Sequence, residues 1–149
     1  MFLSVFFVVF IFFHIIAFFT TDAPFVPIPS ITEREVIKNL KLTNQSVLYD
    51  LGCGNGRILI KAVEANPNIK AVGIEIAFWP YILAKYKTRK YKNIVIKRES
   101  IFESDVVNAT HIFFYLYPAV IDKLIKTLKE KCRPETRVIS CDFDSKIYK

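Results

Sequence analysis

The chain has 149 residues, which supports one domain of ordinary size. Its three cysteines, Cys53, Cys132 and Cys141, are odd in number and lack the spacing of metal ligands, so they exclude a cysteine metal centre and fit a reducing compartment. We therefore predict no metal site. The formal net charge of +7 lies wholly beyond an apolar N-terminal run.

That run covers residues 2–19 and contains no charged side chain, and its length is near the lower limit for a helix that crosses a bilayer. No Lys or Arg precedes it, and Pro24 follows the one small-residue cleavage pattern. It is also longer than the apolar part of a usual signal peptide. We predict an uncleaved transmembrane anchor over residues 1–20 and assign no role to His14.

Prolines punctuate residues 21–30, which we predict to be a connector. A helix is expected to start at Ser30 or Thr32 and to run to about Leu42, because Thr32 and Glu35 have capping-box spacing. Beyond it, strand patterns alternate with helix patterns. The predicted strands cover residues 46–51, 71–76, 93–97, 109–116 and 138–142, and the helices cover 57–65, 78–91 and 118–132.

This alternation implies right-handed βαβ crossovers and a parallel sheet. We predict an α/β fold for residues 31–149, with a Rossmann-like parallel sheet of order 3-2-1-4-5 and helices on both faces. In such sheets a ligand binds outside the carboxyl ends of the strands, where the strand order reverses.

The segment YDLGCGNGR at residues 49–57 lies where the first predicted strand turns into a helix. Alternate glycines allow backbone torsions closed to other residues and a close approach of a ligand. Arg57 stands where the dinucleotide fingerprint has its third glycine, and the Gly-Lys-Ser/Thr ending of a phosphate loop is absent. The pattern therefore indicates a ligand without a pyrophosphate.

A carboxylate and an ammonium suit this loop better, as at the methionine end of S-adenosylmethionine (AdoMet). Asp50 is expected to bind the ammonium. The amides at the start of the following helix are expected to bind the carboxylate. Glu75 ends the second predicted strand, about 20 residues further on, where an acid accepts hydrogen bonds from both ribose hydroxyls. Either feature alone also suits a tight turn or a solvated strand end. The predicted AdoMet site comprises Asp50, Gly52, Cys53, Gly54, Asn55, Gly56 and Glu75.

These motifs resemble those of class I AdoMet-dependent methyltransferases. The likeness extends to a narrower family, the protein-lysine methyltransferases related to the mitochondrial enzyme that acts on the ATP synthase c-subunit, with archaeal and bacterial relatives. PFVPIP at residues 24–29 resembles the family's PYVPTP, with Ile28 in place of threonine, and RVISCDFD at residues 137–144 resembles RVVSHDFD. The resemblance implies that the chain N-methylates a lysine of a membrane-associated protein. It covers the chain from Pro24 to about Asp144.

Further site residues are expected by comparison with the family. An acid near the adenine usually follows the third strand, and the register here offers Ser100 with Glu99 beside it. The methyl acceptor is expected at the ends of the fourth and fifth strands. The candidate catalytic residues there are Asp142, Tyr115 and Tyr117, with Asp144 nearby. The two tyrosines equally suit an aromatic stripe in the core. The two aspartates equally suit a turn after a strand.

Class I enzymes add a sixth strand and an antiparallel seventh strand, whereas this chain ends soon after the fifth. We predict that strands 6 and 7 are missing, either through truncation or with a bare sheet edge, which would invite self-association. A methyltransferase for a membrane lipid or quinone, and a non-catalytic AdoMet-binding protein, stay open as alternatives.

The charges that follow the predicted anchor are mixed in sign, so they do not indicate which side of the membrane the domain faces. Because AdoMet is an intracellular metabolite, we expect the domain to face the cytoplasm, or the matrix in a mitochondrion. The basic block at residues 85–92 suits a solvated helix face, anionic lipid headgroups or nucleic acid. The expected partners are a membrane and a protein lysine, and no nucleic acid.

Overall fold

The computed structural model describes residues 5, 7–12, 30–141 and 147–148. Residues 5 and 7–12 are helical. The predicted anchor (1–20) and connector (21–30) therefore lie largely outside the described residues. Among the residues that are described, no helix is both long and apolar enough to cross a membrane.

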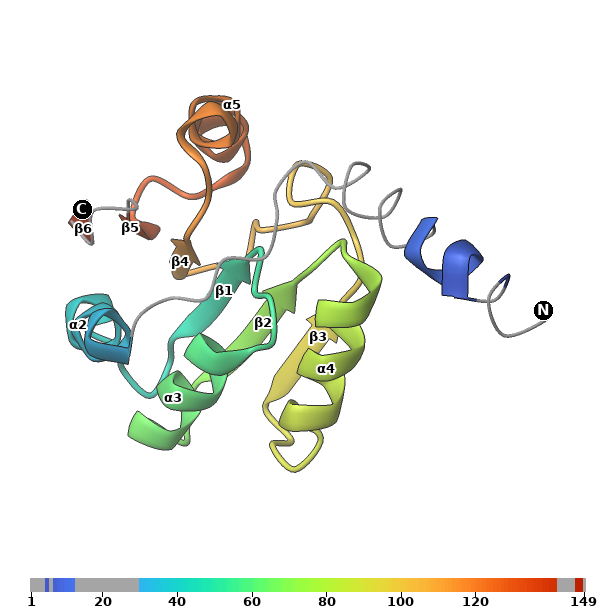
Figure 1. Ribbon diagram of the computed structural model, residues 1–149. Coiled ribbons are helices and arrows are strands. Elements are labelled where there is room, and N and C mark those ends of the chain that lie inside the picture. The colour runs from blue at the N-terminus through green and yellow to red at the C-terminus, as the bar shows by residue number, and fades with distance from the viewer. Residues whose placement is uncertain (1–4, 6, 13–29, 142–146, 149) are drawn as a thin grey trace.

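Helices and strands alternate along the folded domain (Figure 1). The helices are α2 (Ser30–Leu40), α3 (Arg57–Ala65), α4 (Phe78–Thr88) and α5 (Pro118–Lys131). The strands are β1 (Val47–Leu51), β2 (Lys70–Ile74), β3 (Ile94–Lys97), β4 (His111–Phe114), β5 (Arg137–Cys141) and β6 (Ile147–Tyr148). The helix α2 begins at Ser30, the first of the two predicted starts, and Thr32 lies two residues inside it.

The strands form one sheet in the order β3-β2-β1-β4-β5-β6, and the first five are parallel to their neighbours. The predicted order 3-2-1-4-5 is confirmed. β1 is central, and its last residue Leu51 lies opposite Ile74 of β2 and Phe114 of β4. The carboxyl ends of these three strands therefore meet at one edge, where the chain changes direction between β1 and β4.

The expectation that no strand follows β5 is wrong. Strand β6 pairs with β5 in the antiparallel direction and places Tyr148 opposite Ser140 and Ile147 opposite Cys141. Two residues are too few to produce the alternating pattern by which a strand is recognised in a sequence. The edge of β5 is thus covered near its carboxyl end.

Helices lie on both faces of the sheet (Figure 1). Helices α2, α3 and α4 cover one face over a core that includes Leu59, Ala84 and Phe113, and α5 covers the other over Phe114 and Leu124. Adjacent residues of a strand point to opposite faces. Phe113 and Phe114 are both 1% exposed, which explains why three apolar residues follow His111 in β4 without alternation.

A buried carboxylate joins α2 to the helix that follows the glycine loop. Glu33 is 1% exposed, and its carboxylate lies 2.7 Å from Nη2 of Arg57 and 3.6 Å from Nζ of Lys61. Arg57 is the first residue of α3, so this ion pair fixes the start of α3 against α2.

Replacing Glu33 with alanine is expected to lower the free energy of unfolding by about 1–3 kcal/mol, because the charge-assisted contacts are lost while the two half-exposed cations regain water. Urea unfolding measures the change. Glu35→Ala, at an exposed position of the same helix, is the matched control. Equal stability of the two variants would show that the ion pair contributes nothing.

Candidate active site

The glycine loop between β1 and α3 has a left-handed backbone. Gly52, Gly54 and Gly56 have φ values of 82°, 54° and 77°, a region that residues with a side chain rarely adopt. The amides of Gly52 and Cys53 both donate to the carbonyl oxygen of Ile74, at 2.8 and 2.9 Å. The loop is therefore fixed to the end of β2, and Gly56 directly precedes α3.

Glu75 closes the same site from β2. Its Oε2 accepts a hydrogen bond from the Gly54 amide at 2.9 Å, and its Oε1 accepts one from the Ala77 amide at 2.8 Å. The side chain is largely buried, with 9% exposure. A carboxylate has about four acceptor positions, so Glu75 keeps capacity for a ligand's hydroxyl groups. The structure thus brings the glycine loop and Glu75 into direct contact.

Asp50 places a second acid beside them. It is buried near the end of β1, opposite Gly73 of β2. Burial, and then the charge of Glu75, raise the pKa of Asp50 to about 8. Burial also raises the pKa of Glu75, while its backbone hydrogen bonds oppose this shift. Two acids that resist ionisation together favour a cationic ligand group, which would relieve the repulsion between them.

Cys53 lies in the loop as a buried thiol. Burial, followed by the charges of Asp50 and Glu75, raises its pKa well above the ordinary value. A nucleophilic cysteine needs the opposite shift. The Cys53 side chain belongs to the core on the face covered by α2, α3 and α4, and Asn55, two residues further along the loop, is partly exposed.

The sequence interpretation missed Gly73, which lets the loop pack on β2. A Cβ at this position would lie 2.6 Å from Cδ1 of Leu59, 2.7 Å from Sγ of Cys53 and 2.9 Å from Cδ1 of Ile96. A glycine inside a strand is typical of a close approach by another chain segment, and that signal could have identified it.

Gly73→Ala is expected to destabilise the fold by about 1–3 kcal/mol, because the new methyl group overfills the space under the loop. Displacement of Cys53 should also weaken AdoMet binding. Thermal unfolding and calorimetric titration measure the two effects. Cys53→Ala removes one of the three clashing atoms, so the double variant should recover part of the loss. Wild-type stability of Gly73→Ala would contradict this packing.

The residues proposed near the adenine make local contacts. Oγ of Ser100 accepts a hydrogen bond from the Phe102 amide at 3.3 Å, which stabilises a turn after β3. The carboxylate of Glu99 lies 3.9 Å from Nζ of Lys97. Burial, then the charges of Asp105 and Glu99, raise the pKa of Tyr49 on β1. An adenine contact for Ser100 or Glu99 stays a prediction.

The proposed acceptor residues follow β4 and β5. Tyr115 comes directly after β4 and packs against the core on the face of α2, α3 and α4. Tyr117 precedes α5, and its carbonyl oxygen accepts hydrogen bonds from the amides of Val120 and Ile121 at 2.9 and 3.2 Å. Asp142 and Asp144 lie outside the described residues.

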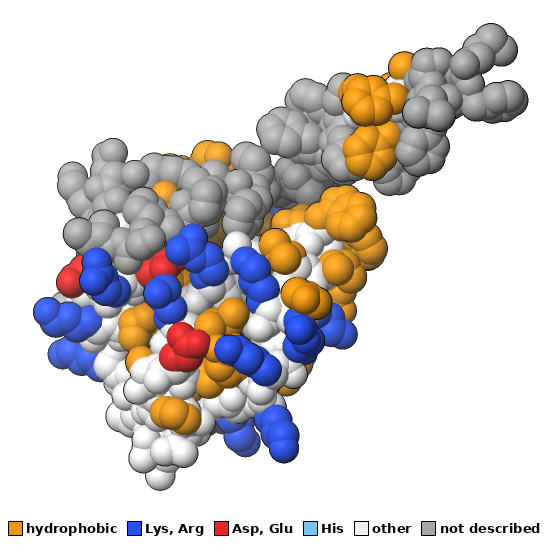
Figure 2. All heavy atoms as spheres, turned by 60° about the horizontal axis from the view of Figure 1, so that its bottom comes forward, with side chains coloured by type: hydrophobic (Ala, Val, Ile, Leu, Met, Phe, Trp, Pro, Cys, Tyr) orange, Lys and Arg blue, Asp and Glu red, His pale blue; other side chains and the backbone are white. Residues whose placement is uncertain are grey.

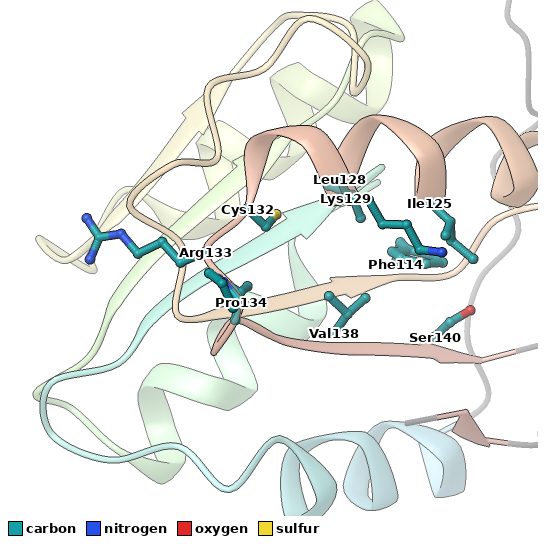
Figure 3. Close-up of a pocket in the computed structure, with 10 residues that line it drawn as sticks. Phe114, Ile125, Leu128, Lys129, Cys132, Arg133, Pro134, Val138 and Ser140 are labelled. Carbon is teal, nitrogen blue, oxygen red and sulfur yellow. The ribbon is translucent and has the colours of Figure 1, made fainter.

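A separate cavity of about 450 Å³ lies between α5 and the strands β4 and β5 (Figure 3). Apolar side chains dominate its lining, among them Phe114, Leu128 and Val138. None of the predicted site residues that the structure describes lines it. The cavity is therefore distinct from the site formed by the glycine loop and Glu75.

Comparison with known proteins identifies the family. The family model described as "ANTKMT methyltransferase domain" matches residues 50–148, from Asp50 of the acidic pair to the end of β6. The chain belongs to the ANTKMT methyltransferase domain family. It is therefore an AdoMet-dependent methyltransferase, as its motifs indicated, and its cofactor is AdoMet.

Curated relatives of this methyltransferase act on lysine. It is 34% identical over 131 residues to a protein-lysine N-methyltransferase of Saccharolobus islandicus, a match that covers 85% of this chain and 80% of that protein. It is 30% identical over 125 residues to the human lysine N-methyltransferase of the ATP synthase c-subunit, covering 80% of this chain. The chain spans about half of that human protein, with 52% covered.

Among solved structures, the methyltransferase resembles an RNA methyltransferase from Salinibacter ruber in complex with S-adenosyl-L-homocysteine. The TM-score is 0.75 at 31% identity, with 78% of each chain covered. A precorrin-6Y C5,15-methyltransferase from Geobacter metallireducens shares the fold, with a TM-score of 0.67 at 15% identity, 80% of this chain covered and 66% of that chain.

The residues of the site fit the cofactor. At Gly52, Gly54 and Gly56 the loop has no side chain, so a ligand can come close to its backbone there. The buried Asp50 suits an ammonium, and Glu75 has acceptor capacity for the ribose hydroxyls.

Proposed function

We propose that this methyltransferase N-methylates lysine side chains of a membrane-associated protein. The observation that carries the proposal is the 34% identity to a protein-lysine N-methyltransferase, which extends over 80% of that relative. The name of the human relative, a lysine N-methyltransferase for a component of the ATP synthase, also supports a lysine acceptor.

In the proposed reaction AdoMet supplies an electrophilic methyl group on a sulfonium sulfur. The chain contributes position and electrostatics. Asp50 and the amides at the start of α3 would hold the amino-acid end, and Glu75 the ribose. The amides of the three loop glycines and of Cys53 already donate to acceptors within the protein. A lysine has an ordinary pKa of about 10.4 and must lose a proton before it attacks. Burial of the lysine beside the cofactor would lower that pKa, because the charged form loses its water.

The acceptor side of the proposal rests on the segments after β4 and β5. Tyr115 and Tyr117 follow β4 at the same sheet edge as Glu75. We propose that the acceptor lysine binds there. Asp142 is the first candidate to orient its amine, and the two tyrosines would line the acceptor site. The variant Tyr117→Phe should leave the AdoMet affinity unchanged if Tyr117 contacts only the acceptor.

Membrane association is part of the same proposal. The apolar run at residues 2–19 is the supporting feature, with residues 1–20 as a single-pass anchor and the domain facing the cytoplasm, or the matrix if the protein is mitochondrial. An anchor would raise the effective concentration of a membrane-bound acceptor.

Incubation of the full chain with isolated membranes, cytosol and total RNA in the presence of methyl-tritiated AdoMet tests the acceptor. We expect label in protein bands of the membrane fraction, and methyllysine after acid hydrolysis. Glu75→Ala is the control that lacks cofactor binding.

The other outcomes refute the lysine proposal in distinct ways. Label confined to the organic extract would indicate a lipid or quinone methyltransferase. Label in RNA would assign the chain the substrate class named for its Salinibacter ruber relative. Label in protein without methyllysine would move the acceptor to another side chain.

A further inference from the structure

Helix α4 has an apolar stripe that faces away from the protein. Trp79, Ile82, Leu83 and Tyr86 are spaced i, i+3, i+4 and i+7, and all are exposed, with Trp79 and Tyr86 at 62%. The face that α4 buries is formed by Ala84 and Thr88. Because helical residues are about 100° apart, the stripe lies opposite that buried face. It is a second apolar face that stays exposed in the described part of the chain.

Charge is concentrated around this stripe. Residues 76–98 contain seven Lys and Arg side chains and no acid. The rest of the chain contains 14 basic and 14 acidic residues, so the entire net charge of +7 belongs to this one segment. On the helix, Lys87 flanks the stripe on one side and Lys85 on the other. Figure 2 shows apolar side chains gathered on the side of α4 with Lys and Arg side chains beside them.

The aromatic rings of this region are paired with cations. The guanidinium of Arg89 lies 3.8 Å from the ring centre of Tyr86, and that of Arg98 lies 5.2 Å from the ring centre of Phe78. Phe78 also stacks edge-on against Trp79, at 5.2 Å between ring centres. Both guanidiniums also donate to backbone carbonyl oxygens, Arg89 Nη1 to Tyr86 at 2.8 Å and Arg98 Nε to Ile76 at 3.2 Å. Exposed cations are thus held directly beside the apolar surface.

We propose that this face of α4, formed by Phe78, Trp79, Ile82, Leu83 and Tyr86 with its flanking basic residues, docks on an anionic bilayer surface. Aliphatic side chains at the centre of the stripe suit acyl chains and cannot stack on bases, which favours lipid over RNA. The surrounding cations complement anionic headgroups. The inference goes beyond the anchor, because it concerns the folded domain, and it does not depend on the acceptor.

Docking would also orient the active site relative to the bilayer. Phe78 and Trp79 begin α4 three and four residues after Glu75, so the stripe starts at the sheet edge that carries the site. With this face on the bilayer, the site formed by the glycine loop and Glu75 would lie close to the membrane plane. If the proposed function holds, acceptor lysines just outside the bilayer would be within reach.

Trp79 is the only tryptophan in the chain, so intrinsic tryptophan emission reports on this face alone. The full chain is mixed with phosphatidylcholine vesicles that contain 0% or about 30% phosphatidylglycerol, with and without bromine-labelled acyl chains. We expect a shift to shorter wavelength and quenching by the brominated lipid with the anionic vesicles. Loss of two basic side chains in Lys85→Ala/Lys87→Ala should lower the ratio of docked to undocked chains by roughly 30-fold.

The matched control is Lys126→Ala/Lys129→Ala, which removes the same charge from exposed positions of α5 and should leave the signal unchanged. Vesicle-bound protein with unshifted, unquenched Trp79 would overturn the proposal, because binding would then come from another part of the chain. An emission change produced by single-stranded RNA and not by vesicles would overturn it as well. Either result leaves the proposed lysine methylation untouched, and that activity is scored separately by methyllysine.

Discussion

Replacing Glu75 with alanine is expected to raise the dissociation constant for AdoMet by roughly 100-fold or more. Each hydrogen bond from a ribose hydroxyl to a carboxylate contributes about 1.5–3 kcal/mol, and two would be lost. The Gly54 amide would also lose its acceptor at 2.9 Å, so the loop would be held less firmly. Isothermal titration with AdoMet and with S-adenosylhomocysteine measures the change.

Glu103→Ala is the control for the loss of an acid at an exposed position, and it should bind AdoMet normally. If Glu75→Ala fails to fold, Glu75→Asp retains the charge on a shorter side chain and should show an intermediate loss of affinity. Unchanged affinity in a folded Glu75→Ala protein would refute the assignment of Glu75 to the ribose.

AdoMet binding is expected to release about one proton per site below pH 8. The pKa of Asp50 is raised to about 8 by burial and by Glu75, so its carboxyl group is mostly protonated at lower pH in the absence of ligand. An ammonium beside it favours the ionised form. Affinity should therefore rise about tenfold per pH unit up to about pH 8, because binding is coupled to proton release.

Titrations near pH 6.5 in two buffers of different ionisation enthalpy count the released protons, and Asp50→Asn should abolish the release. Asp105→Asn, at an exposed position, should not abolish the release.

The raised pKa of Asp50 also affects the pH dependence of stability, with a defined sign. Since the folded-state value exceeds the ordinary 3.8, the proton stabilises the fold, and the free energy of unfolding without AdoMet should fall between about pH 4 and pH 8. Zero proton release with a flat stability profile would contradict the buried acid pair.

Elements with clear local boundaries were predictable from the sequence. The helix expected over residues 57–65 is α3, because Gly56 precedes it and Asn66 and Pro67 follow. The helix expected to reach residue 91 ends at Thr88, where the Tyr91 amide bonds to the Thr88 carbonyl in a turn at 2.8 Å. The apolar pattern continues through that turn, so periodicity alone could not locate the end.

Strand lengths depended on the neighbouring strands. β4 was expected over residues 109–116, but only His111–Phe114 pairs with both β1 and β5. β2 was expected to reach Ile76, but the carbonyl oxygen of Ile74 already accepts the amides of Gly52 and Cys53. These limits come from contacts with distant segments, which a local pattern does not contain.

For the site, spacing was sufficient to pair the glycine loop with Glu75, because strand, loop, helix and strand of ordinary lengths bring the two strand ends together. The ion pair of Glu33 with Arg57 was not predictable, since nothing in α2 marks one of its acids as buried. The outward stripe on α4 was hidden for a related reason. An apolar helix face is normally interpreted as core, and only the structure shows that Ala84 and Thr88 form the buried side.

A crystal structure of the full chain with S-adenosylhomocysteine tests the site most directly. We expect both ribose hydroxyls within hydrogen-bond distance of the Glu75 carboxylate, and the amino group of the ligand beside Asp50. A nucleoside bound elsewhere, such as in the cavity under α5, with Glu75 bonded only to the amides of Gly54 and Ala77, would contradict the proposed cofactor site.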